Sequence, residues 1–185
     1  MTKTKWLLDR THSELGFKVK HLMISNVSGS FTEFDVEVLT EDENFNTAEI
    51  SAKIKSASIN TNNMQRDQHL RNSDFFDVEQ YPEMLFKSDR IEQIDDDQFI
   101  VHGRLTIKGV TKPIELKVEY SGTTIDPWGG RRAGFAITGK IKRSEFGVSF
   151  NTILDSGGVA LGEEVKVSSE IQLVKQQENV VEKSA

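Results

Sequence analysis

The chain contains no cysteine among its 185 residues, which excludes disulfide bonds, thiolate nucleophiles and cysteine-based metal sites. It also lacks any apolar run near the roughly 20 residues that a transmembrane helix needs. Its net charge is −6, and this excess of acidic groups disfavours a partner with a phosphate backbone. We therefore expect no nucleic acid partner and no transmembrane segment.

The N-terminal stretch lacks the apolar region of a signal peptide. Residues 6–8 form too short an apolar run, and Asp9 and Arg10 end it. We expect a cytoplasmic protein, or an extracytoplasmic one if a leader has been removed. The length suits one domain with its own core, which we place at residues 1–175, followed by a polar C-terminal tail at 176–185.

What the chain does contain is eight stretches in which apolar and polar residues alternate with a period of two. Such alternation is typical of strands with one buried face, and it predicts an all-β fold, an eight-stranded antiparallel β-barrel. A barrel of this size is either just filled by its own side chains or holds one small ligand. Between the first two stretches, residues 26–30 are predicted to form a turn. The apolar positions are Leu15/Phe17/Val19, Phe34/Val36/Val38, Ala48/Ile50/Ala52/Ile54, Met84/Phe86/Ser88, Phe99/Val101/Gly103/Leu105/Ile107, Ile114/Leu116/Val118/Tyr120, Phe135/Ile137/Gly139/Ile141 and Val165/Val167/Ser169/Ile171/Leu173.

Five small residues share the inward parity of the large apolar ones: Ala48, Ala52, Gly103, Gly139 and Ser169. Small side chains remove volume from a barrel interior, so they predict a cavity. The alternative is that small and large residues alternate to fit the taper of a filled barrel.

One long insertion, residues 60–82, breaks the period-two pattern and predicts a short helix or an irregular cover over the barrel. Asn62 and Ser73 are its predicted N-caps. Arg66, His69 and Arg71 lie in this insertion, where they either meet a polar headgroup at the barrel mouth or form a solvated helix face.

The four histidines show no metal-ligand spacing, and the acidic run at 95–97 is typical of a solvated turn, so we expect no metal. His21 shares the apolar parity of its strand, and is either a ligand contact or a satisfied histidine at the barrel rim. Asp9, His12 and Ser13 could be drawn as a catalytic triad, but adjacency in sequence does not establish that geometry.

Several ordered motifs resemble those of the YceI-like family, and the likeness covers residues 6–173. The resemblance implies a lipocalin-like barrel that carries polyisoprenoids or other long-chain amphiphiles, without catalysis and without a cofactor. The motifs are Trp6-x-x-Asp9-x-x-His12-Ser13, Arg66-Asp67-x-His69-Leu70, Asp74-Phe75-Phe76-Asp77, Gly103-x-Leu105-Thr106-Ile107-x-Gly109-Val110-Thr111-x-Pro113 and Arg143-Ser144-x-Phe146-Gly147.

On this interpretation the partner is a lipid or an isoprenoid-like small molecule. A hydrolase that uses residues 66–69 on an amphiphilic substrate and a ligand-free barrel that acts through its surface remain alternatives, and a homodimer stays open. The expected ligand-binding residues are Phe17, Val19, His21, Val36, Ile50, Ala52, Ile54, Arg66, His69, Phe86, Leu105, Leu116, Phe135 and Ile137.

Overall fold

The computed structural model describes residues 2–152, 154 and 160–177, of which 63% lie in strands of a single antiparallel sheet. The only α-helix of this part of the chain is α1, Met64–Arg71. The predicted tail, 176–185, is described only at Gln176 and Gln177, and its remainder lies outside the described residues. The strands are β1 (Lys3–Leu8), β2 (Glu14–His21), β3 (Ser25–Phe31), β4 (Phe34–Glu41), β5 (Asn44–Lys55), β6 (Ile59–Asn60), β7 (Glu83–Gln93), β8 (Gln98–Ile107), β9 (Val110–Ile125), β10 (Arg131–Lys142) and β11 (Leu161–Lys175).

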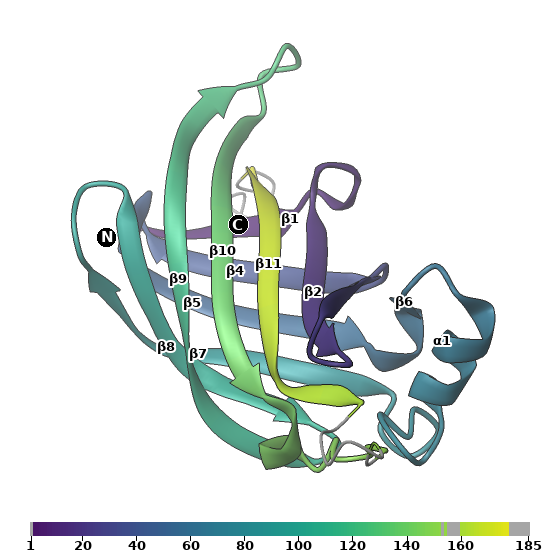
Figure 1. Cartoon of the computed structure of the whole chain (residues 1–185). Helices are drawn as coiled ribbons and strands as arrows, with labels where there is room; N and C mark the ends of the chain where they lie inside the picture. The colour runs from purple at the N-terminus through teal and green to yellow at the C-terminus, as the bar shows by residue number, and fades with distance from the viewer. Residues whose placement is uncertain (1, 153, 155–159, 178–185) are drawn as a thin grey trace.

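The sheet closes into the predicted eight-stranded barrel because β1 pairs with β4 along one edge and with β11 along the other, and three of the barrel strands are each bent and divided into two segments (Figure 1). β11 pairs with β10 along one edge, and along its other edge with both β1 and β2. β4 and β3 then pair with β1 and β2, while β5 and β6 pair with β4 and β3. Each bent pair therefore counts as one barrel strand, and the eight-stranded prediction is confirmed.

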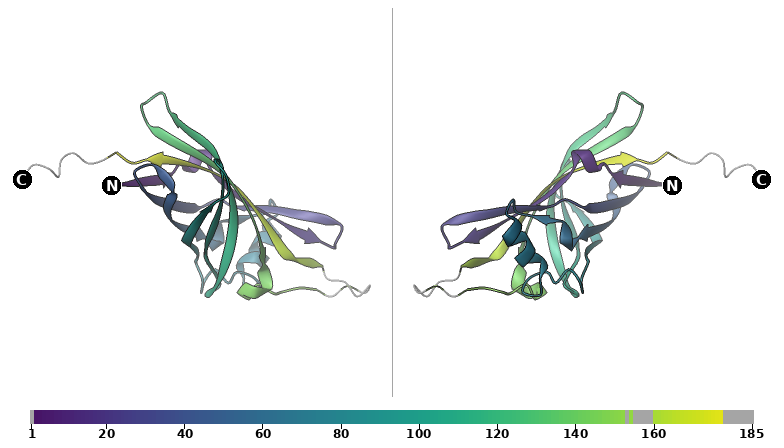
Figure 2. Two further views of the ribbon diagram at one scale, coloured as in Figure 1. Left: turned by 90° about the vertical axis from the view of Figure 1, so that its left-hand side faces the viewer. Right: turned by 90° about the vertical axis from the view of Figure 1, so that its right-hand side faces the viewer.

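The expected turn at residues 26–30 is wrong, because these residues lie in β3 and pair with β2. The chain reverses earlier, at residues 22–24. The β2–β3 and β9–β10 hairpins extend from the barrel in different directions (Figure 2).

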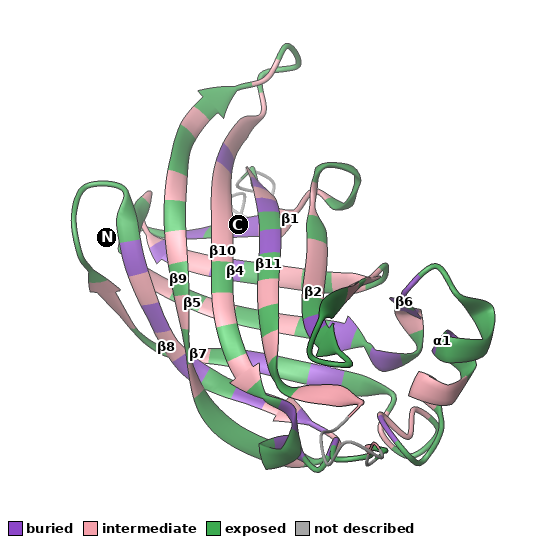
Figure 3. Ribbon diagram, in the orientation of Figure 1, coloured by how far each residue is buried: buried purple, intermediate pink, exposed green. Residues whose placement is uncertain are grey.

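Alternation along the strands separates the two faces of the barrel wall, as Figure 3 shows by burial. Val19 is buried between the exposed Lys18 and Lys20. On β9, Leu116 points inward between the exposed Glu115 and Lys117. The period-two pattern of the sequence therefore places the apolar side chains inside.

The α1 helix lies within the predicted insertion and begins one residue later than expected. Asn63 is its N-cap, since Asn63 Oδ1 accepts a hydrogen bond from the backbone N of Arg66 at 3.0 Å. Asn62 instead takes a left-handed conformation with φ 59°. Ser73 caps no helix and lies in a run of turns.

Aromatic side chains form a cluster at each end of the barrel interior. Phe45 contacts Trp6, Tyr120 and Phe135, with ring centroids 5.0, 5.5 and 5.0 Å away respectively. Near α1, Phe31 and Phe76 meet edge to face at 5.9 Å. The space left between these clusters is the candidate site.

Candidate functional site

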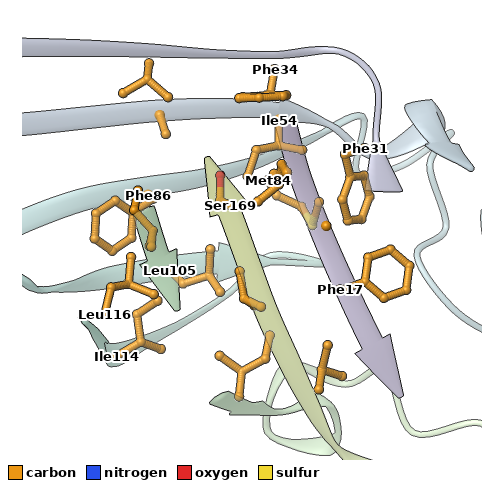
Figure 4. Close-up of a pocket in the computed structure, with 18 of the residues that line it drawn as sticks. Phe17, Phe31, Phe34, Ile54, Met84, Phe86, Leu105, Ile114, Leu116 and Ser169 are labelled. Carbon is orange, nitrogen blue, oxygen red and sulfur yellow. The ribbon is translucent and has the colours of Figure 1, made fainter. Parts of the chain in front are cut away.

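A cavity of about 290 Å³ occupies the barrel interior, and its wall includes Phe45 from one aromatic cluster and Phe31 and Phe76 from the other. Figure 4 shows part of this wall. Each of the eight barrel strands contributes side chains to its wall, and the insertion adds Leu70, Phe75 and Phe76. Several inward side chains, among them Phe17 and Leu116, are only half-buried although they point into the barrel. A filled interior would bury them completely, so this barrel is not packed solid.

The small residues play two different roles. Ala48, Ala52 and Ser169 line the cavity, as predicted. At Gly103 an added Cβ would lie 2.5 Å from Phe86 Cζ, and at Gly139 it would lie 2.7 Å from Leu116 Cδ2. These two glycines therefore make room for large neighbouring side chains, as in a filled barrel. Both predicted explanations of the small residues hold, but at different positions: Gly103 and Gly139 accommodate neighbours, whereas Ala48, Ala52 and Ser169 line a cavity.

The wall presents very little polarity to the cavity. Ser169 Oγ donates to the backbone oxygen of Glu14 at 2.6 Å, which satisfies its hydroxyl within the barrel. Arg143 is the sole charged side chain of the wall among the residues that the structure describes. The cavity therefore suits an apolar chain.

Eleven of the fourteen residues expected to bind a ligand line this cavity. His21, Arg66 and His69 do not: His21 is exposed at the end of β2, and the other two lie in α1. The eleven are Phe17, Val19, Val36, Ile50, Ala52, Ile54, Phe86, Leu105, Leu116, Phe135 and Ile137.

The basic side chains of the insertion are bound to the protein itself. Arg66 donates to Thr61 Oγ1 and to the Thr61 backbone oxygen, each at 2.7 Å. Arg71 donates to the backbone oxygens of Ala57 and Ile59 at 2.9 and 3.2 Å. These contacts fasten α1 to the segment that follows β5, which favours a structural role for both arginines.

His69 also contacts its own insertion. Its Nε2 lies 2.9 Å from Asp74 Oδ2, and its ring meets Phe75 and Phe150 edge to face, each at 5.0 Å. Asp67, beside Arg66, is buried and accepts hydrogen bonds from Thr61 N and Oγ1 at 2.9 and 2.5 Å. A direct role of residues 66–69 toward a ligand or substrate stays a prediction.

Arg143 is the charged wall residue that the sequence analysis did not single out, although it opens one of the quoted motifs. Apolar wall residues such as Phe45, Ile59 and Ile91 were also not singled out. Arg143 begins the short 3-10 helix Arg143–Phe146 after β10, and it is only 5% exposed. Its Nε donates to Gly162 O at 2.8 Å, and its Nη1 donates to Val148 O and Phe150 O at 2.8 and 2.9 Å. Burial lowers the pKa of this guanidinium from its ordinary value. Arg143 therefore ties the segment after β10 to the start of β11.

Asp9, His12 and Ser13 do not form a catalytic triad. His12 Nδ1 lies 2.9 Å from Asp9 Oδ2, but Ser13 Oγ accepts from the backbone N of Gln172 at 3.0 Å instead of contacting the histidine. Arg132 binds the Asp9 carboxylate and donates to Asp126 Oδ2 at 2.7 Å. The group is thus an ion-pair network that joins β10 to the start of the chain.

Because of this network, the free energy of unfolding depends on pH in the acidic range. Burial of the Asp9 carboxyl raises its pKa. Hydrogen bonds from His12, Thr11 and Arg132 outweigh that effect and hold the pKa well below its ordinary value. A carboxyl whose folded pKa is depressed stabilises the fold above its unfolded pKa of about 4, and this contribution is lost as the pH falls further.

Asp9→Asn is therefore expected to lower the free energy of unfolding by about 2 kcal/mol at neutral pH, because charge-assisted hydrogen bonds are lost. The difference from the unsubstituted protein should shrink steadily below about pH 4. Urea unfolding at a series of pH values measures both effects. Asp35→Asn is the control, since Asp35 pairs with Arg10 at an exposed site and should matter little. A difference that does not depend on pH would contradict the assignment.

Within the described residues no group of three histidine or acidic side chains could hold a metal ion. No helix of that same part of the chain has the length and apolar character needed to cross a bilayer.

Known proteins are similar to this chain in sequence and in fold. A UPF0312 protein of Staphylococcus aureus is 40% identical over 164 residues, which cover 88% of this chain and 93% of that protein. The crystal structure of a Campylobacter jejuni YceI protein is 36% identical and has a TM-score of 0.73, covering 92% of this chain and 97% of its own. A polyisoprenoid binding domain from Saccharophagus degradans, with a TM-score of 0.68 and 16% identity over 92% of this chain and 98% of its own, shares the fold. Since the model of the YceI-like domain also matches residues 6–173, the chain belongs to the YceI-like family.

Proposed function

We propose that this protein is a carrier for a long-chain amphiphile, a polyisoprenoid or a similar lipid, whose apolar chain lies in the barrel. The observation that carries the proposal is the apolar cavity of about 290 Å³, to which every barrel strand contributes. This volume lies just below the roughly 300–1,000 Å³ typical of small-molecule sites. The eleven predicted wall residues are its proposed contacts.

The energetics of burial support this ligand class. Each methylene moved from water into an apolar site contributes about 0.8 kcal/mol, so a ten-carbon stretch contributes about 8 kcal/mol. The cost of association and of ordering the chain reduces this sum, yet micromolar affinity remains within reach.

The composition of the wall also favours a carrier over the hydrolase alternative. General acid-base catalysis needs a titratable side chain within hydrogen-bond reach of the reacting atom. Among the described residues, no histidine, lysine or carboxylate lines the cavity. The similar barrel from Saccharophagus degradans is described as polyisoprenoid binding, and we extend that ligand class to this chain as part of the proposal.

Native mass spectrometry of protein purified without detergent tests the proposal. We expect a bound molecule of a few hundred daltons that is released by organic solvent and is rich in methylene or isoprene units. The same spectrum reports whether the protein is a homodimer. If the protein carries no such molecule and also takes up none of a series of polyprenyl and fatty-acyl probes, the ligand-free barrel is the better account.

A further inference from the structure

The tip of the β2–β3 hairpin exposes three consecutive apolar side chains. Leu22, Met23 and Ile24 are 39, 61 and 83% exposed. The tip is a tight turn, since the backbone N of Ile24 donates to His21 O at 3.2 Å. A run of apolar residues at an exposed turn is unusual, because polar residues and glycine dominate such positions.

The backbone of this turn is also unfavourable for the residues that form it. Leu22 and Met23 have φ values of 52° and 62°, in the left-handed region. A β-turn whose two central residues both have positive φ favours Asn and Gly at these positions, and a bulky side chain there costs stability. Within the part of the chain that the structure describes, neither exposure nor backbone geometry explains why Leu and Met occupy the tip, which favours a contact outside this part of the fold.

A second feature lies beside the tip, on the outer face of the same sheet. Lys140, Lys166 and Lys18 face one another directly across β10, β11 and β2. All three are exposed, and in the described part of the chain none has a carboxylate within 4 Å. Like charges opposite each other destabilise a sheet, and this row occurs in a chain of net charge −6.

Lys20 extends this basic surface along β2 toward the tip. Two acidic residues precede Lys166 on β11: Glu164 lies opposite another lysine, Lys142, and Glu163 Oε1 accepts from the backbone N of Ser144 at 2.8 Å. The row of Lys140, Lys166 and Lys18, together with Lys20, is called the lysine row below.

We propose that the hairpin tip and the lysine row dock this protein on an anionic lipid bilayer. The apolar tip enters the interface between headgroups and acyl chains, while the lysines contact anionic headgroups. β2 also contributes Phe17 and Val19 to the cavity wall, so docking brings the cavity near the bilayer. The proposal concerns surface binding and does not depend on what the cavity holds.

The β9–β10 hairpin provides a matched control at a different place on the barrel. Its tip exposes Ile125 and Trp128 at 64 and 86%, but its turn places Gly129 at φ 85°, where glycine is favourable. Its nearby cation Arg132 is paired with carboxylates. This tip therefore has apolar exposure without the unfavourable turn and without a free basic surface.

The test is cosedimentation with vesicles of phosphatidylcholine that contain about one third phosphatidylglycerol. We expect the unsubstituted protein to bind these vesicles, and to bind pure phosphatidylcholine at least tenfold more weakly. The double variant Leu22→Asn/Met23→Gly matches the turn geometry, so it should fold with an equal or higher thermal midpoint and still lose at least tenfold in binding. Ile125→Ser/Trp128→Ser should bind as the unsubstituted protein does.

Two double variants test the lysine row, and each of them removes two positive charges. Lys18→Gln/Lys166→Gln should weaken binding to the anionic vesicles by about tenfold or more, since each lysine near an anionic surface contributes about fivefold. Lys53→Gln/Lys87→Gln, on the outer face of β5 and β7, should change binding less than twofold. Added salt should weaken the binding of the unsubstituted protein.

Several outcomes would overturn the proposal: no binding of the unsubstituted protein to anionic vesicles, full binding by Leu22→Asn/Met23→Gly, or equal losses in both lysine pairs. A dimer in solution that only Leu22→Asn/Met23→Gly dissociates would assign the tip to contact between copies of this chain, and would also overturn the proposal.

Ala52→Phe, which fills the cavity, should bind vesicles normally. That variant separates a failure of docking from a failure of the proposed carrier function.

Discussion

Ala52→Phe is expected to reduce the affinity for a long-chain fluorescent fatty acid by at least thirtyfold while changing the free energy of unfolding by less than about 1 kcal/mol. Ala52 lies on β5 in the cavity wall, so the added ring occupies space that the ligand would use. Loss of three or more buried methylenes accounts for an affinity change of this size, at about 0.8 kcal/mol each. Fluorescence titration and urea unfolding measure the two quantities.

Ala133→Phe is the matched control for Ala52→Phe. Ala133 is 1% exposed, does not line the barrel cavity and belongs to the buried cluster of Trp6, Ile171 and Leu173, so a phenyl ring there would push against these packed side chains. Overpacking of this kind costs about 1–3 kcal/mol or more. If Ala52→Phe destabilised the protein as much as Ala133→Phe, the interior near Ala52 would be filled rather than open.

Arg143→Met is expected to lower the free energy of unfolding by about 3–5 kcal/mol. The substitution keeps an unbranched side chain but leaves the carbonyls of Val148, Phe150 and Gly162 without their donor. Each buried acceptor that loses its partner costs about 1–3 kcal/mol. Urea unfolding measures the loss.

Arg104→Met is the control for Arg143→Met, because Arg104 is half-exposed on β8 and pairs with Asp89 at the surface. Exposed pairs of this kind contribute about 0–1 kcal/mol. Equal effects of the two substitutions would show that the buried guanidinium does not hold the segment after β10 in place.

Part of the candidate site could be predicted because inward orientation is a local property of a strand. Phe17, Val36, Ile50 and Leu116 point inward because each alternates with polar neighbours, and all four line the cavity. Arg66 and His69 were predicted from chemistry alone, and their contacts with Thr61 and Asp74 depend on how the insertion folds. The alternation of apolar and polar residues in the sequence gives no information about such side-chain contacts.

Arg143 is a residue of the cavity wall that the period-two alternation of the sequence did not predict. It lies two residues after Ile141 and so continues the inward parity of β10, but it is in a 3-10 turn, where parity does not fix the orientation of a side chain. Its donors meet Gly162 and Phe150, carbonyls that only the return of the chain into β11 brings close. The one available signal was the Arg143-Ser144-x-Phe146-Gly147 motif, which contributes to the resemblance to the family.

The sequence by itself determined most of the strands and their inward faces, the helical insertion and the membership of the family, because alternation and ordered motifs are properties of neighbouring residues. It did not determine β3, where a turn was expected. Only the tertiary structure decided where the barrel strands bend, which small residues line the cavity and which make room for a neighbour. Gly103 and Ala52 have the same parity, yet Phe86 packs over Gly103 while Ala52 faces open volume. The reason is physical: empty space depends on the register of strands distant in the chain, which fixes the large side chains that meet each small one.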